Sequence, residues 1–186
     1  TTALTSAPDD TDEFLVSDAG TLKRIDYSLI KGGGITVADQ FRLTSNKTGN
    51  SDITANLERI DTAGQGGMTD NQMSESSGIF TFPLTGIYLV SFDTWGTAPN
   101  ESGGDTQTLY IKATTDNSSY SIIAESTVGD GDNRQVTASN SSLIDVTNTS
   151  NVKVKFTADS MASGTYWAGS TSNNSTSFTF IRLGDT

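Results

Sequence analysis

Residues 75–95, ESSGIFTFPLTGIYLVSFDTW, decide the fold class of this chain. Two apolar runs, rich in β-branched and aromatic residues, flank the segment Pro83-Leu84-Thr85-Gly86. A proline followed closely by a glycine is typical of a turn, and runs of this composition are typical of strands. The segment therefore predicts a β-hairpin over residues 78–95.

Similar strand signals recur from Ile35 to the end of the chain, separated by polar turns that contain glycine. Residues 152–158 alternate most clearly, with Val152, Val154 and Phe156 on one face and Lys153 and Lys155 on the other. This spacing predicts an all-β fold, a sandwich or jelly roll of about ten strands. The expected strands are 36–44, 54–60, 78–82, 87–95, 106–113, 120–125, 134–138, 142–146, 152–158 and 177–183.

Composition limits the classes of partner. A chain of 186 residues accommodates one principal β domain and a short additional segment. The formal net charge of −11 argues against nucleic acid as a partner, because affinity for phosphates depends on lysine and arginine. No apolar run approaches the roughly 20 residues of a membrane-spanning helix, so no membrane insertion is expected.

The chain contains no histidine and no cysteine, which excludes an imidazole base, a thiolate nucleophile and the usual zinc ligands. A glycosidase that uses two carboxylates is the remaining enzymatic alternative. The adjacent pairs Asp9 with Asp10 and Asp12 with Glu13 lie in a polar leader, where solvated surface charge is the simpler interpretation. We therefore expect a protein that is not an enzyme and that requires no cofactor, calcium being the one ion to consider.

The first 34 residues differ in character from the rest and end at a triple glycine, so we place the domain boundary between 1–34 and 35–186. Asp18-Ala19-Gly20 separates two short apolar pieces and predicts a small hairpin, and residues 26–30 are compatible with a helical turn. Leu15, Leu22 and Leu29 are seven residues apart, which a parallel coiled coil would use. Gly20 and the short length oppose that alternative.

The aromatic pair Phe80 and Phe82, the Pro83–Gly86 corner and the following run with Tyr88, Val90 and Phe92 resemble the centre of a complement-type globular head. This is the trimeric jelly roll shared with tumour necrosis factor. The resemblance extends as a pattern over residues 35–186. It includes residues 38–42 as a first strand and residues 143–146 as a late strand.

The resemblance implies a homotrimer in which the central segment and the last strand contribute to a threefold interface. By position, this role falls on Tyr88, Val90, Phe178 and Phe180. The runs 87–90 and 178–183 also carry apolar residues on both faces, and a neighbouring subunit would supply the second covering surface.

A second, shorter resemblance concerns residues 18–24, DAGTLKR, which are similar to the joints between modules of bacteriophage fibre proteins. This resemblance implies a location on the virion surface, with residues 1–34 joining the head to other virion proteins.

Two sets of residues are candidate binding sites. Trp95, Tyr166 and Trp167 lie beside glycine- and serine-rich loops, where an exposed aromatic plane would contact a sugar or a protein receptor. The alternative is that these aromatics fill the end of the core. The oxygen ligands of Asp130, Asp132 and Asn133 suit calcium, and some heads of the resembled family hold calcium near their apex; an acidic turn is the alternative.

These observations predict a trimeric tip of a virion fibre or appendage that binds a glycan or protein on the host surface, with weak contacts adding through avidity. A capsid decoration protein without receptor binding and a secreted cellular adhesion head are the alternatives.

Overall fold

The computed structural model of the chain describes residues 5–30, 34–66, 70–97, 106–129 and 135–186. These residues form two compact units, Thr1–Gly34 and Ile35–Thr186. The division falls at the triple glycine, and each unit is described by itself.

The first unit is a small antiparallel hairpin of β1 (Glu13–Asp18) and β2 (Thr21–Asp26), followed by the helical turn α1 (Tyr27–Ile30). Ala19 and Gly20, with φ angles of 51° and 84°, make the two-residue turn with two positive φ angles that matches strand twist. The expected hairpin and helical turn are both present. The coiled-coil alternative is wrong, because Leu15 and Leu22 lie on strands.

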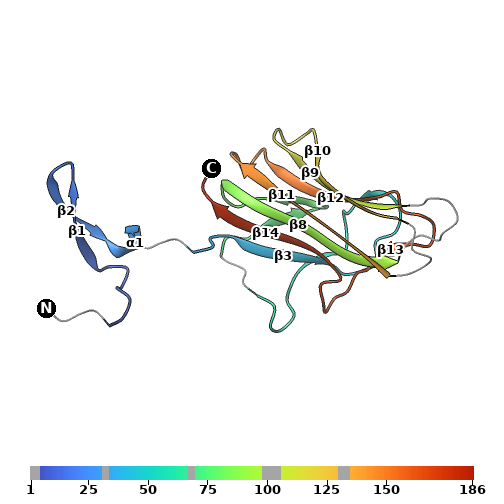
Figure 1. Cartoon of the computed structure of the whole chain (residues 1–186), viewed down its shortest axis with the longest axis horizontal. Helices are drawn as coiled ribbons and strands as arrows, with labels where there is room; N and C mark the ends of the chain where they lie inside the picture. The colour runs from blue at the N-terminus through green and yellow to red at the C-terminus, as the bar shows by residue number, and fades with distance from the viewer. Residues whose placement is uncertain (1–4, 31–33, 67–69, 98–105, 130–134) are drawn as a thin grey trace. The chain divides into compact units, whose positions relative to one another are not determined.

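The second unit is a sandwich of two antiparallel sheets of six strands each (Figure 1). The first sheet has the order β10-β9-β12-β7-β6, with β4 beside β12, and the second has the order β11-β8-β14-β3-β5, with β13 beside β8. The first sheet comprises β4 (Ser51–Asp52), β6 (Ser74–Ser76), β7 (Ile79–Thr81), β9 (Gln107–Thr114), β10 (Ser121–Val128) and β12 (Lys153–Asp159). The second comprises β3 (Ala38–Leu43), β5 (Leu57–Arg59), β8 (Gly86–Thr97), β11 (Gln135–Val146), β13 (Tyr166–Trp167) and β14 (Thr176–Gly184).

The stretch 75–95 is two strands, as expected, but it is not a hairpin. β7 pairs with β6 and β12 in the first sheet, whereas β8 pairs with β11 and β14 in the second. The segment between them is therefore a corner between the two sheets. Both runs direct aromatic side chains into the same core, where the rings of Phe82 and Tyr88 are 4.7 Å apart, and the Tyr88 hydroxyl donates to Leu84 O.

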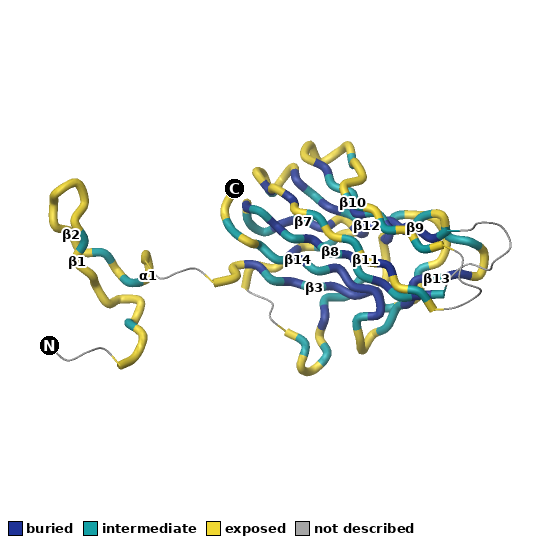
Figure 2. The backbone as a smooth tube through the Cα atoms, in the orientation of Figure 1, coloured by how far each residue is buried: buried dark blue, intermediate teal, exposed yellow. Residues whose placement is uncertain are grey.

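The core between the sheets is built around aromatic rings. Phe156 from the first sheet and Phe178 from the second have ring centroids 4.6 Å apart, and Phe92 stacks on Phe178 at 5.0 Å. The predicted alternation of residues 152–158 is confirmed, since Val154 and Phe156 are buried while both lysines point outward and are half-buried. Figure 2 shows that the buried residues lie mainly along the strands of the second unit, and α1 is the only helix within the described ranges.

The strand positions agree with the sequence-based expectation except in four places. Residues 134–138 and 142–146 were expected as two strands, but one continuous strand, β11, pairs with β8 from Gln135 to Val146. The short strands β4, β6 and β13 were not expected. In the described part of the chain, no helix has the length and apolar character needed to cross a bilayer.

The sandwich has two distinct ends, which we call the base and the distal end. Ile181 of β14 pairs with both Ala38 of β3 and Leu89 of β8, and Gly184 pairs with Ile87. The start of β3, the start of β8 and the end of β14 therefore lie together at one end, which is the base. Thr97 at the other end of β8 pairs with Tyr166 and Gln135. The distal end is therefore opposite to the end of the sandwich at which β3 begins.

The turn between β9 and β10 depends on one carboxylate. Asp116 Oδ1 accepts from the backbone N–H groups of Ser119 at 2.8 Å and Ser118 at 2.9 Å and from the Thr114 hydroxyl at 2.7 Å. The hydrogen bond from Ser119, followed by those from Thr114 and Ser118, holds the pKa of Asp116 well below its ordinary value of 3.8.

The lowered pKa means that the ionised carboxylate stabilises the folded state. This contribution is fully present at pH values above the pKa of Asp116 in the unfolded chain, and it is lost as the pH falls toward the lower pKa of Asp116 in the folded protein. We expect Asp116→Asn to lower the chemical-unfolding midpoint at neutral pH, and the difference from the unsubstituted protein to shrink below a pH of about 4. Denaturant titrations at several pH values measure this difference. A difference that does not change with pH would contradict the assigned role of the charge.

Candidate functional site

Two of the three predicted receptor-binding aromatics are accessible at the distal end. Along β8, inward and outward side chains alternate, and Trp95 is half-buried on the outward side of the second sheet. Tyr166 of β13 is also half-buried and lies opposite Thr97, on the same outward side as Trp95. The structure therefore brings Trp95 and Tyr166 to one end of one sheet face.

Trp167 does not belong to this site. It lies opposite Gly96, points inward and is fully buried, so the prediction that it contacts a receptor is wrong and the core interpretation holds. Close approach of the two strands requires glycine at position 96, because a Cβ there would lie 2.0 Å from Tyr166 O and 3.0 Å from a Trp167 ring carbon. Trp167 closes the distal end of the core.

A polar pocket of about 230 Å³ also lies at the distal end, within residues 43–56. The backbone of Lys47, which lines the pocket, exchanges hydrogen bonds with the backbone of Trp167 at 2.9 and 3.0 Å. The Lys47 ammonium donates to Thr48 O at 2.7 Å and to Gly49 O, and burial lowers the pKa of this side chain. Most of the remaining lining carries hydroxyl, amide or carboxylate groups, from Ser45, Asn46, Thr48, Ser51, Asp52, Thr54 and Asn56.

The predicted calcium ligands Asp130, Asp132 and Asn133 lie outside the described residues. Elsewhere, within the described ranges, no group of three or more acidic side chains could hold a metal ion. The acidic pairs of the leader are exposed: Asp12 accepts a hydrogen bond from the backbone of Asp9, and Glu13 pairs with Arg24. They do not form a buried pair of carboxylates facing a cleft.

The predicted trimer-interface residues are on the wrong face of their strands. Tyr88, Val90, Phe178 and Phe180 are each 0% exposed in a single protomer, because their side chains point into the core between the sheets. They therefore present no surface to another copy. The outward side chains of the same two strands include Leu89 and Ile181, which are partly exposed.

The outward face of the second sheet is apolar near the base. Leu143 of β11 lies opposite Leu89 of β8, Leu89 lies opposite Ile181 of β14, and Ile181 lies opposite Ala38 of β3. We call these four residues the apolar row. Leu143 is 62% exposed, and Leu89, Ile181 and Ala38 are partly exposed. Further toward the distal end the face becomes polar, with Ser91, Ser141, Asp93 and Ser139.

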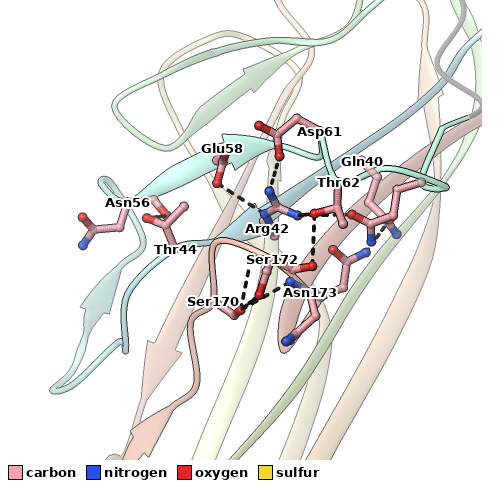
Figure 3. A network of polar contacts seen from close by, with 12 residues as sticks. Gln40, Arg42, Thr44, Asn56, Glu58, Asp61, Thr62, Ser170, Ser172 and Asn173 are labelled. Carbon is pink, nitrogen blue, oxygen red and sulfur yellow. Dashed lines mark hydrogen bonds and ion pairs between the residues drawn. The ribbon is translucent and has the colours of Figure 1, made fainter.

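At the β3 side, this outward face is already covered by the chain itself. Arg42 points outward from β3, yet its side chain is 0% exposed because segments 58–65 and 170–174 fold over it (Figure 3). The guanidinium donates to Thr62 Oγ1 at 2.7 Å, Gln65 Oε1 at 3.1 Å and Glu58 Oε2 at 3.3 Å, and it also pairs with Asp61.

One further hydrogen bond joins the two covering segments to each other, and another joins segment 170–174 to β3. Thr62 Oγ1 donates to Ser172 O at 3.0 Å, and Asn174 donates to Gln40 Oε1 at 2.6 Å. Burial lowers the pKa of Arg42, but hydrogen bonds and charge from Glu58 and Asp61 outweigh this effect and raise it overall. The network therefore keeps a buried, paired charge and restricts the accessible apolar surface to the β11, β8 and β14 side.

The outward face of the first sheet carries a second charged cluster. Lys112 and Lys155 lie directly opposite each other, and Asp52 pairs with Lys155 at 2.7 Å and Lys112 at 3.5 Å. Lys155 also lies 4.4 Å above the ring of Tyr120. Burial raises the pKa of Asp52, but the lysines and the Thr157 hydroxyl outweigh it, so the pKa is lowered. Asp52 compensates one of the two positive charges, and the second remains partly exposed. Because the ion pairs are made within the protein, we assign this cluster a structural role.

Comparisons with known proteins bear on the fold. No protein-family model and no curated protein matches the sequence. Among solved structures, murine APRIL is similar with a TM-score of 0.56 and 10% identity, over 78% of this chain and 98% of that one. Eiger TNF from S. frugiperda has a TM-score of 0.57 and 10% identity, over 82% of this chain and 96% of its own.

The globular domain of zebrafish complement 1qA has a TM-score of 0.51 and 14% identity, over 81% of this chain and 99% of its own. These likenesses show the fold: residues from Ile35 onward form a jelly roll of the type found in tumour necrosis factor and complement heads. The resemblance inferred from the aromatic pattern around Pro83 is confirmed at that level.

Proposed function

We propose that residues 35–186 form a homotrimeric, non-enzymatic head that binds a ligand at its distal end. The observation that carries the homotrimer is the apolar row at the base, because exposed apolar side chains gathered on one sheet mark an interaction site. A jelly roll of this type, together with the absence of histidine and cysteine from the sequence, supports a binding role.

The distal end supplies the groups for recognition. Trp95 and Tyr166 offer aromatic surface with low conformational entropy, and the neighbouring pocket offers hydroxyl, amide and ammonium groups. Three copies of this end in one trimer would make weak contacts additive. A glycan or protein on a host cell is the ligand class that these groups suit.

The similarity of residues 18–24 to joints of bacteriophage fibre proteins supports a place on the virion surface, as a fibre or appendage tip. In this proposal, residues 1–34 connect the head to other virion proteins. A decoration protein would share the fold and the trimer but would bind no host molecule.

Adsorption of the full chain to host cells tests the ligand-binding part. We expect the variant Trp95→Ala/Tyr166→Ala to bind at least about 30-fold more weakly than the unsubstituted protein, since buried aromatic contacts of this kind contribute about 2 kcal/mol or more. Ile122→Ala, which removes an exposed apolar side chain from the other sheet, is the control and should bind normally.

An unsubstituted protein that neither binds host cells nor competes with infection would contradict the receptor-binding role and favour decoration of the virion. Normal binding by the double variant would show that recognition lies elsewhere on the head.

A further inference from the structure

The hairpin of β1 and β2 exposes more apolar side chain than a free-standing unit of its size can support. Leu15 and Leu22 are each 69% exposed, and Leu29 of α1 is 73% exposed. A two-stranded hairpin is marginally stable in water and needs further strands or a packed face. Both β1 and β2 are also edge strands, with backbone groups free to pair with another chain.

The two faces of the hairpin differ. One face carries Phe14, Val16 and Ile25, and it is partly covered because the ring of Tyr27 lies 6.0 Å from that of Phe14. The backbone N–H of Tyr27 donates to Asp12 O at 2.7 Å, which fixes this cover. This face is therefore partly closed by the unit itself.

The opposite face, which we call the leucine face, is formed by Glu13, Leu15, Ser17, Leu22, Arg24 and Asp26. Leu15 lies in its middle pair, opposite Arg24, and Leu22 lies at its turn end, opposite Ser17. Arg24 also pairs with Glu13 at 2.6 Å, while its side chain remains 70% exposed. Asp26 makes no ion pair with any residue in the described part of the chain. Two exposed leucines beside side chains of both signs of charge make this face complementary to a second copy of itself.

We propose that the leucine faces of neighbouring copies of this chain pack against one another and form a stem below the head. This inference rests on the proposed trimer. Four residues, 31–34, separate α1 from the head, and a chain spans at most about 3.6 Å per residue. Three hairpins on such short tethers share a small volume, which corresponds to a millimolar effective concentration.

The partner of the leucine face is thus the same segment of another protomer. In the assembled stem, Leu15 and Leu22 lose their contact with water, and Arg24 of one copy can pair with Asp26 of the next. The residues before the hairpin stay available for attachment to other virion proteins.

Because the chain has no cysteine, a single introduced thiol can form a disulfide only with the same residue of another copy. The rate of this reaction shows whether that position faces itself across the interface. We expect Leu22→Cys in the full chain to form disulfide-linked dimers under mild oxidation at least tenfold faster than Thr21→Cys. Thr21 is the matched control, since it is exposed and adjacent but lies on the opposite face. A disulfide needs Cβ atoms about 3.5–4.5 Å apart, so only facing positions react quickly. Leu15→Cys should behave like Leu22→Cys.

Sedimentation of the unoxidised variants separates the two proposals. A trimer in which Leu22→Cys and Thr21→Cys cross-link at equal rates, or not at all, would overturn the stem and leave the trimeric head standing. The leucine face would then be the attachment site for a different virion protein. A monomer at micromolar concentration would overturn both.

Discussion

Phe178→Ala is expected to lower the free energy of unfolding of the head by about 3–5 kcal/mol, the usual cost of removing a fully buried phenylalanine. Phe178 is 0% exposed, and its ring lies within 6.0 Å of Phe80, Phe92 and Phe156. Its removal would leave a cavity between the two sheets that these rings cannot fill, because each is fixed by its own strand.

Denaturant unfolding at one fixed protein concentration measures this loss, since association makes apparent stability depend on concentration. Ile122→Ala is the control, and we expect it to change the free energy of unfolding by about 0.5 kcal/mol or less. A Phe178→Ala protein that is well folded but dissociated would indicate that Phe178 lies at a subunit interface. This result would contradict the inward orientation of its side chain.

Leu89→Asp is expected to leave the protomer folded and to abolish the proposed trimer. Leu89 lies in the middle of the apolar row, between Leu143 and Ile181. A carboxylate at this position would have to be buried without a partner on association, and we expect the dissociation constant of the trimer to rise at least about 100-fold, or roughly 3 kcal/mol.

Sedimentation over a dilution series measures the trimer, and circular dichroism reports whether the β fold is retained. Ile122→Asp is the matched control, because it places the same charge on the outward side of the first sheet. A Leu89→Asp protein that remains trimeric would show that the apolar row is not the self-association surface.

The sequence was sufficient to predict the fold class because most strands carry a period of two and are separated by turn residues. It was not sufficient to predict the orientation of the strands that are apolar on both sides. Successive residues of β8 point to opposite faces of the sheet: one face has Tyr88, Val90 and Phe92, and the other has Ile87 and Leu89. The face that has Leu89 continues with the polar residues Ser91 and Asp93. These polar residues were the signal in the sequence that Leu89 faces outward and Tyr88 faces inward.

Features that depend on distant partners escaped prediction. The turn residues Pro83–Gly86 fit a hairpin as well as a corner between sheets, and only the pairing of β7 with β12 and of β8 with β14 distinguishes the two. The polar stretch 139–141 has the composition of a loop, but continuous pairing with β8 holds it in a strand.

The charge of Arg42 presents the same difficulty. An arginine in a strand suggests an exposed side chain, whereas partners 16 to 23 residues away bury it completely. For the binding site, the sequence identified Trp95 and Tyr166 by their position beside loops. It also included Trp167, because adjacent residues on a strand point to opposite sides and composition does not show which side is which.

The start of β3 and the end of β14 both lie at the base of the sandwich, which has a practical consequence. Residue 35 and the final strand leave from the side opposite to Trp95 and Tyr166. A fluorescent protein joined after Thr186 would therefore emerge away from the aromatic end and leave it accessible to cells. Such a fusion would allow the proposed binding of the head to cells to be followed by microscopy.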